Sequence, residues 1–405
     1  MLKLETTIFA LTLMTLGALS LEVEAQTEGD ATVDALIGLG FENVGWSEDE
    51  KERVYILQNT TYKLQAVGLR KAIDVVQDMG LPADKVCRIV VLDNNVPQVS
   101  LRYRPIVGDS VPPPEVSDWD VTYDLGPSWK TARRAKRNNS SLFKVDIVVY
   151  PQLLFKNVVI TQIYQACLDV SPAIEVSLWK GSRLQVQVAI PVYNDGYTGE
   201  RENIRWGYMN LQQDVRLPYN IFARATVGIF SQRTYGAEIR LFRPFSDERF
   251  SFEAKYGFVG VGYFNTLSAF KYSKETIHYW SVGPDFYWPY FNVQFQLRLE
   301  QYLMHDIGLR GELIRHFKYA SVGFYAEISN KASSNGGFRI QIALPPYKYR
   351  RRGYIPRITT STSTGITYNG GNEGTYYLMP HPSAGDNILT RNKFNPKYLK
   401  TEIEN

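Results

Sequence analysis

FNVQFQLRLE, residues 291–300, alternates apolar and polar side chains at every position. Successive side chains of a β-strand point to opposite faces, so this segment has one apolar and one polar face as a strand. Similar alternation recurs at residues 184–190, 211–217 and 338–344. A soluble β-sandwich would also alternate, but repeated segments of about ten residues have the length that a tilted strand needs to cross a bilayer. The region therefore predicts an all-β, antiparallel transmembrane barrel.

Short and long connections alternate along this region. The pattern divides residues 143–345 into about 12 strands, at 143–154, 161–179, 183–192, 207–217, 219–230, 234–243, 248–260, 278–288, 290–301, 306–317, 319–329 and 337–345. The connections 193–206, 261–277 and 330–336 are long and fall on one side of the barrel. Outer-membrane barrels have short turns on the periplasmic side. Because the strand count is even, both flanking segments are predicted to lie in the periplasm.

Aromatic side chains mark the predicted short turns. The chain has 27 Tyr, 20 Phe and 7 Trp, and aromatic rings are favoured where a bilayer meets water. The pattern predicts an interfacial girdle made of Trp179, Tyr219, Phe245, Trp288, Tyr290, Phe317, Tyr319 and Tyr347.

The segments that flank the barrel have other patterns. A basic residue followed by a short apolar stretch predicts a signal peptide over residues 1–25. Residues 26–104 combine an amphipathic helix with extended segments, which predicts a small periplasmic α/β module. Prolines and basic residues predict an exposed linker over residues 105–142. Residues 346–405 are predicted to form a periplasmic C-terminal tail.

Several classes of chemistry have little support in the sequence. The formal net charge is only +4, so nucleic acid is not a predicted partner. The cysteines, Cys87 and Cys167, are predicted to be isolated thiols, with a single disulfide as the alternative. The four histidines are scattered, with no pair at metal-ligand spacing. We therefore predict no catalytic residue, cofactor or metal; the enzymatic alternative is a lipase, which needs Ser and His together on the outer wall of the barrel.

Charged residues of both signs gather on the polar faces of the predicted strands. The candidates for the barrel lumen are Asp214, Arg216, Arg224, Glu238, Arg240, Arg298, Glu300, Arg310 and Glu312, with Glu253 and Lys255 beside them. Two interpretations are open: the residues line a wet path and bind sugar hydroxyls, or they pair with one another and plug the lumen. The narrow interior of a barrel of this size favours the plug.

Short sequence patches resemble the YjbH family of Gram-negative exopolysaccharide-operon proteins, also called GfcD in the capsule operon. The patches are LGFENV at 39–44, NVP at 95–97, YPQL at 150–153, LWKG at 178–181, VAIPVY at 188–193 and LFRPF at 241–245. The resemblance implies an outer-membrane barrel that works with periplasmic and lipoprotein partners in the export or surface assembly of a polysaccharide. It implies no catalytic residue. Longer members of the family look like two barrels in one chain, whereas this sequence has the length for one.

Three functions follow as hypotheses. The first is a non-catalytic outer-membrane barrel that assists exopolysaccharide or capsule secretion, in contact with outer-membrane lipid and polysaccharide. The others are a general solute porin and a plugged structural barrel. The basic runs at residues 131–137 and 348–352 either contact anionic lipid or polymer or are simply solvated, and solvation is favoured.

Overall fold

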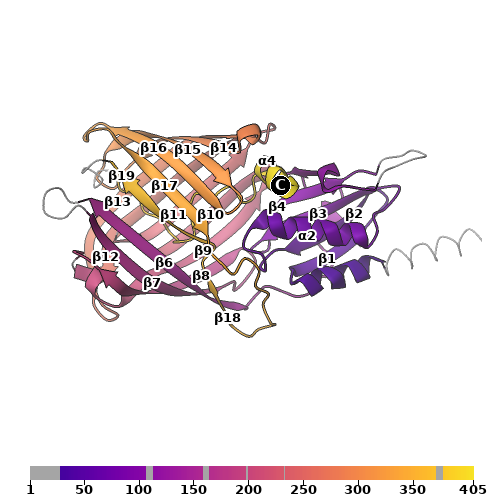
Figure 1. Ribbon diagram of the computed structural model, residues 1–405, viewed down its shortest axis with the longest axis horizontal. Helices are drawn as coiled ribbons and strands as arrows, with labels where there is room; N and C mark the ends of the chain where they lie inside the picture. The colour runs from indigo at the N-terminus through magenta and orange to yellow at the C-terminus, as the bar shows by residue number, and fades with distance from the viewer. Residues whose placement is uncertain (1–27, 106–112, 158–163, 198, 232, 371–376) are drawn as a thin grey trace, which may run out of the picture.

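The protein consists of a β-barrel with a smaller α/β module at one end (Figure 1). The computed structural model describes residues 28–105, 113–157, 164–197, 199–231, 233–370 and 377–405. The predicted signal peptide lies outside the described residues. Among the described residues, no helix is both long enough and apolar enough to cross a membrane.

The barrel wall is an antiparallel meander of strands, each hydrogen-bonded to the next. Its strands are β6 (Val145–Asn157), β7 (Tyr164–Val176), β8 (Ser182–Asn194), β9 (Arg205–Leu217), β10 (Ile221–Phe230), β11 (Thr234–Pro244), β12 (Phe250–Phe264), β13 (Phe270–Trp288), β14 (Val293–Gln301), β15 (Ile307–Phe317), β16 (Ala320–Ser329) and β17 (Asn335–Ala343). Each strand predicted from the sequence has a counterpart, and the predicted transmembrane β-barrel is confirmed.

Two strands that the sequence did not predict bring the sheet close to a full ring. After β17 the chain turns back as β18 (Arg357–Thr360), parallel to β6, and β19 (Ser363–Asn369), antiparallel to β17. The sheet therefore has 14 strands rather than about 12. The expectation that the residues after 345 form a tail outside the barrel was wrong, because a run of Thr and Ser carries no contrast between apolar and polar faces.

The outer wall of the barrel is apolar and its inner wall is polar. The Phe and Leu residues of β14 are exposed on the outside, whereas its Gln, Arg and Glu residues are buried inside, apart from the half-buried Gln301. All eight aromatic residues predicted for the girdle are exposed, from 42% for Tyr319 to 84% for Tyr290. They lie at the turns on the module side, where the membrane-facing band of such a barrel meets water.

The long loops lie at the opposite end from the module, and one of them was wrongly predicted. Strand β13 begins at Phe270, so much of the predicted loop 261–277 continues the β12–β13 hairpin. Side chains on both faces of that extension are largely exposed. Without a buried face the two-residue pattern disappears, which explains why the sequence did not mark it as strand.

The module is a sheet in the order β1-β2-β3-β4-β5. Its elements are a helix over residues 28–39, β1 (Glu42–Glu48), β2 (Glu52–Gln58), α2 (Gln65–Asp78), β3 (Val86–Asp93), β4 (Val96–Tyr103), β5 (Trp119–Thr122) and α3 (Trp129–Ala132). The crossover through α2 makes β2 and β3 parallel, and the other pairs are antiparallel. Because β5 and α3 complete this sheet and its outer face, the expected linker over 105–142 is in part module.

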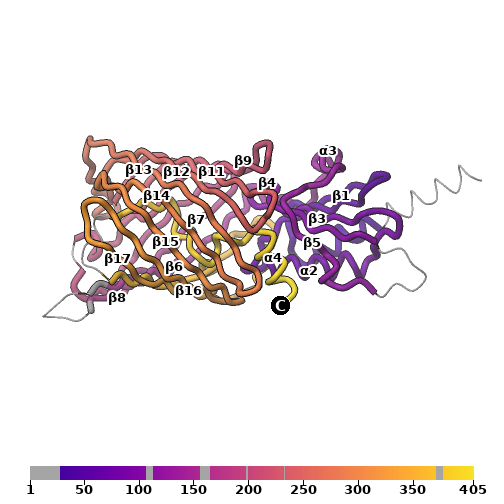
Figure 2. The backbone as a smooth tube through the Cα atoms, turned by 90° about the horizontal axis from the view of Figure 1, so that it is seen from above, coloured from indigo at the N-terminus to yellow at the C-terminus, as the bar shows by residue number. Residues whose placement is uncertain are grey.

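The chain returns through the barrel to the module after β19 (Figure 2). We call residues 377–395 the lumen segment. At the loop end, Leu303 N donates to Leu378 O (3.1 Å), and at the module end Lys393 Nζ donates to Asp93 (2.7 Å). The lumen segment leads into helix α4 (Pro396–Glu404), whose first backbone N–H groups are capped by the side chain of Asn395.

Helix α4 belongs to the hydrophobic core of the module. Its Leu399 and Ile403 are 0% and 2% exposed and pack in one cluster with Leu69 and Ile73 of α2. The module is therefore built from both ends of the described chain, and the two ends lie on the same side of the barrel.

Candidate functional site

A chamber of about 480 Å3 lies where the module, the barrel wall and the lumen segment meet. The module contributes the turn and helix start at residues 58–67, and the lumen segment contributes residues 389–395. The barrel contributes charged and amide side chains from β6 to β14 together with the rings of Phe222 and Phe242. The chamber is thus lined by hydrogen-bonding groups and by aromatic faces.

Three of the predicted lumen residues line this chamber, and each has a partner of opposite charge. Arg224 Nε donates to Asp214 (2.7 Å) across neighbouring strands. Arg240 lies 2.7 Å from Asp386 of the lumen segment and 3.6 Å from Glu238, which also accepts from the Tyr279 hydroxyl (2.9 Å). The pairing of Arg240 fixes the lumen segment to the wall, a contact that the sequence did not reveal.

Four more of the predicted residues, Arg298, Glu300, Arg310 and Glu312, contact one another or further strand residues inside the barrel. Arg298 donates twice to Asp285 (2.7 and 2.9 Å), and Glu300 accepts from Ser281 Oγ (3.0 Å). Arg310 lies 2.6 Å from Glu327, and 3.7 Å from the predicted Glu312. These charges are therefore largely compensated by other residues of the wall.

Arg216 is placed differently from the other candidates. Its guanidinium donates to the carbonyl oxygens of Gln98 (3.0 Å), Pro97 (3.3 Å) and Tyr123, all in the module. Arg216 therefore holds the module against the barrel rim, a contact that the sequence did not predict. Backbone carbonyls of a distant segment give no signal in the sequence.

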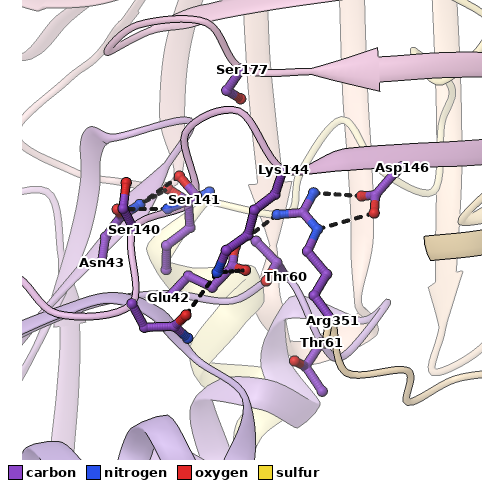
Figure 3. Close-up of polar contacts among 12 residues, drawn as sticks. Glu42, Asn43, Thr60, Thr61, Ser140, Ser141, Lys144, Asp146, Ser177 and Arg351 are labelled. Atoms are coloured by element: carbon purple, nitrogen blue, oxygen red, sulfur yellow. Dashed lines mark hydrogen bonds and ion pairs between the residues drawn. The ribbon is translucent and has the colours of Figure 1, made fainter. Parts of the chain in front are cut away.

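A buried ion network joins the module to the seam of the barrel (Figure 3). Glu42, 1% exposed, accepts from Lys144 Nζ (2.9 Å) at the start of the barrel and from Arg351 Nη1 (2.7 Å) after β17. Arg351 and Arg357 both donate to Asp146 of β6. Because β18 follows directly, this network fixes both the module and strand β18.

A neutral hydrogen-bond network continues this junction beside Glu42 (Figure 3). Asn43 has a left-handed backbone conformation (φ 52°) that Asn tolerates, and its side chain contacts Gln58 (2.9 Å) and Ser141 Oγ (2.8 Å). Asn95 of the β3–β4 turn donates to the same Ser141 hydroxyl (3.0 Å). The LGFENV and NVP patches of the sequence thus meet at one junction, although nothing in their spacing predicted it.

Lys63 lies in the chamber without a carboxylate partner within 4.0 Å among the described residues. Its Nζ donates to Leu344 O and Ser361 O (both 2.9 Å) and to the Thr360 hydroxyl. Burial, together with the nearby positive charge of Arg357, lowers the pKa of Lys63 to about 8. Lys63 therefore binds the chain between β17 and β19 from the module side.

A Ser and a His lie close together, but inside the barrel. His316 Nδ1 and Ser321 Oγ are 2.9 Å apart, and Asn392 of the lumen segment contacts the other ring nitrogen at 3.3 Å. His316 and Ser321 are 1% and 0% exposed. A barrel lipase needs this pair on its outer wall. Here the pair is buried and packs the wall against the lumen segment.

The two cysteines are free and buried, Cys87 in the module and Cys167 in β7. The prediction of two isolated thiols is confirmed.

Comparisons with known proteins give only distant likenesses. No family model matches the sequence, and no curated protein matches it either. Among solved structures, a loop L8 deletion mutant of OmpT, an outer membrane protein of Vibrio cholerae, is 10% identical with a TM-score of 0.26, over 49% of this chain and 87% of that one. In-vitro folded OmpT is 9% identical with a TM-score of 0.25, over 49% and 80%. The assignment as a barrel rests on the strand pairing described above.

Proposed function

We propose that this chain is an outer-membrane protein that assists the secretion or surface assembly of an exopolysaccharide without catalysing a reaction. In this proposal the module and helix α4 lie in the periplasm. The partners are outer-membrane lipid, the polysaccharide, and periplasmic and lipoprotein components of a secretion system. The proposal is supported by the resemblance of the sequence to the YjbH family and by the apolar outer wall of the barrel.

The lumen segment is the observation that carries the mechanism. It is bonded to the wall at the loop end through Leu378, midway through Asp386, and to the module through Lys393. A barrel of this size has little free width once a chain crosses it. A general solute porin is therefore the weaker alternative, and a plugged structural barrel is the stronger one. We propose that the protein acts as a scaffold whose contacts with polymer and partners are made at its module end.

The chamber has chemistry that suits a neutral, polyhydroxylated ligand. Among the described residues, its eight carboxylates face ten Arg or Lys side chains, so most of the charge of the lining is neutralised within the chamber. Amide and hydroxyl groups such as those of Gln185 and Tyr150 supply donors and acceptors, and aromatic rings supply apolar faces. These properties support contact with sugar residues of a polymer.

Two measurements test the proposal separately. Deletion of the gene should reduce secreted polysaccharide, and the intact gene should restore it; an unchanged amount of polymer would refute the export role. The purified full chain in planar bilayers should show no steady large conductance. A large, persistent conductance would instead favour the porin and would contradict a plugged lumen.

A further inference from the structure

The rim loop, residues 345–356 with the sequence PPYKYRRRGYIP, connects β17 to β18 at the module end of the barrel. Figure 1 shows this connection projecting beside β18 at the barrel rim. Its backbone is held by the module: Lys63 N donates to Tyr347 O (3.0 Å), and Tyr349 N donates to Thr61 O (2.8 Å). The rim loop is therefore a fixed surface element that stands next to the membrane-facing wall.

The cations of the rim loop divide into two groups. Arg351 is half-buried and pairs with Glu42 and Asp146. Lys348, Arg350 and Arg352 are exposed, and within the described parts of the chain no carboxylate lies within 4.0 Å of any of them. Arg350 donates to the carbonyl oxygen of Gly38 (2.7 Å), and Lys348 Nζ lies 5.3 Å from the centre of the Tyr62 ring, but neither contact neutralises a charge. The structure therefore neutralises the inward cation and leaves the positive charge of the three outward cations without a carboxylate.

Large apolar side chains are exposed beside these cations. Tyr354 and Ile355 are 65% and 68% exposed. Phe143, 61% exposed, precedes Lys144, whose Nζ lies 5.9 Å from the centre of the Tyr354 ring. Exposed apolar groups of this kind mark contact surfaces, because their transfer out of water is favourable.

The position of the rim loop relates it to the bilayer. The ring of Tyr347 lies 4.9 Å from that of Tyr319, so the loop is continuous with the aromatic residues at the module-side turns. Ile358, three residues after Ile355, is 64% exposed on the wall strand β18. The loop therefore begins and ends at the level where the membrane-facing wall meets water.

We propose that the rim loop binds phosphate-bearing, anionic lipid headgroups of the leaflet on the module side. Lys348, Arg350 and Arg352 contact the phosphates, and Tyr354 and Ile355 insert into the interfacial layer. The adjacent basic and apolar groups favour a lipid surface over an acidic polymer, because a polymer in water offers nothing to bury the apolar pair. The inference rests on the barrel spanning a membrane and does not depend on the role in polysaccharide export.

The contact of the three cations with lipid phosphates can be tested by measuring lipid binding to the full chain in detergent micelles. Native mass spectrometry would follow titrations with phosphatidylglycerol and with phosphatidylcholine. The variant K348Q/R350Q/R352Q should lose affinity for phosphatidylglycerol by about fivefold for each charge removed, with binding of phosphatidylcholine unchanged. The matched control K130Q/R133Q/R134Q removes the same charge from exposed positions of the module and should bind phosphatidylglycerol like the native chain.

Three results would overturn the proposal. One is equal affinity of the native chain and the rim-loop variant for phosphatidylglycerol. Another is an equal loss in the control, which would reduce the effect to net charge. The last is loss of binding to polygalacturonate with lipid binding retained, which would assign the surface to an acidic polymer. Heat-modifiable migration on gels verifies that each variant forms its barrel.

A fluorescent label at position 355 tests the insertion. Because Cys87 and Cys167 are both buried, the substitution Ile355→Cys introduces a thiol that can be labelled selectively. In lipid nanodiscs, lipids that carry a quencher near the headgroup should quench this label several-fold more than one at Glu50→Cys, an exposed module site. Equal, water-like quenching at the two positions would refute the insertion of Ile355.

Discussion

Lys393 and Asp93, 300 positions apart in the chain, form an ion pair with 2.7 Å between Nζ and the carboxylate. Asp93 ends strand β3 of the module, and Lys393 lies at the module end of the lumen segment. The other oxygen of Asp93 is 3.7 Å from the guanidinium of Arg183 in β8. One carboxylate thus joins the module, the barrel wall and the lumen segment.

The first prediction concerns pH. Burial alone would raise the pKa of Asp93, but Lys393 and Arg183 outweigh it and lower the pKa from 3.8 to about 2. Because the folded-state pKa is the lower one, the stability contributed by this carboxylate is present above about pH 4. It is lost as the pH falls toward 2. We expect the Tm of the native chain in detergent to fall between pH 5 and pH 2 more steeply than that of D93N; identical slopes would contradict this.

The second prediction concerns Glu42. In E42Q the buried cations of Lys144 and Arg351 lose a charged partner, which costs about 3–5 kcal/mol when a buried pair is broken. The module should melt at a lower temperature, and protease should cut the junction faster. Asp120→Asn is the matched control, because its side chain is 62% exposed in its pair with Arg102. A change in stability as small as that of the control would show that the network is not structural.

The third prediction concerns the bond between the lumen segment and the wall. In D386N, Arg240 keeps acidic neighbours on the wall such as Glu238, at 3.6 Å, but loses its partner in the lumen segment. The lumen segment should therefore loosen, and brief conductance events should appear in planar bilayers. The double variant R240Q/D386N removes both charges of the pair and should be more stable than R240Q, which leaves Asp386 as well as Glu238 without Arg240. Asp247→Asn, in an exposed pair with Arg249, is the control. If D386N showed no more conductance events than the control, Asp386 would not be holding the lumen segment against the wall.

The fourth prediction concerns the contribution of α4 to the module. Leu399→Ala removes a fully buried side chain from the module core and should destabilise the module by about 2–5 kcal/mol. Circular dichroism would follow the melting of the module. Leu297→Ala, on the outer wall where Leu297 is 46% exposed, should leave the melting of the module unchanged. Equal melting of the native chain and L399A would mean that the module does not depend on α4.

The predictability of the wall follows from its two environments. Each strand from β6 to β17 separates an apolar exterior from a polar interior. Apolar and polar residues therefore alternate along its sequence with a period of two. The predicted strand 290–301 differs from the observed Val293–Gln301 mainly because Pro289–Phe291 form a turn. Strands β18 and β19 lack the contrast. The place of β18 in the sheet depends on pairing with β6, whose residues lie more than 200 positions away.

The sequence predicted which charged residues lie on the inner wall, but it did not predict their ion-pair partners. Alternation places Arg240 on the inner face, yet its partner Asp386 lies in a segment without periodicity. Glu42 was part of a recognised patch, but its pairing with Arg351 depends on how the tail returns to the module. A signal for α4 was present in the sequence: Asn395-Pro396 is a helix start, followed by apolar residues on one face.

The packing of α4 into the module has a consequence for the order of assembly. Residues 396–404 complete the core of a unit whose other elements come before the barrel strands, and the lumen segment that carries them is enclosed by those strands. The core of the module and the enclosure of the lumen segment by the wall are therefore parts of one assembly. Partners that recognise only the finished module would engage only molecules in which α4 has returned to it.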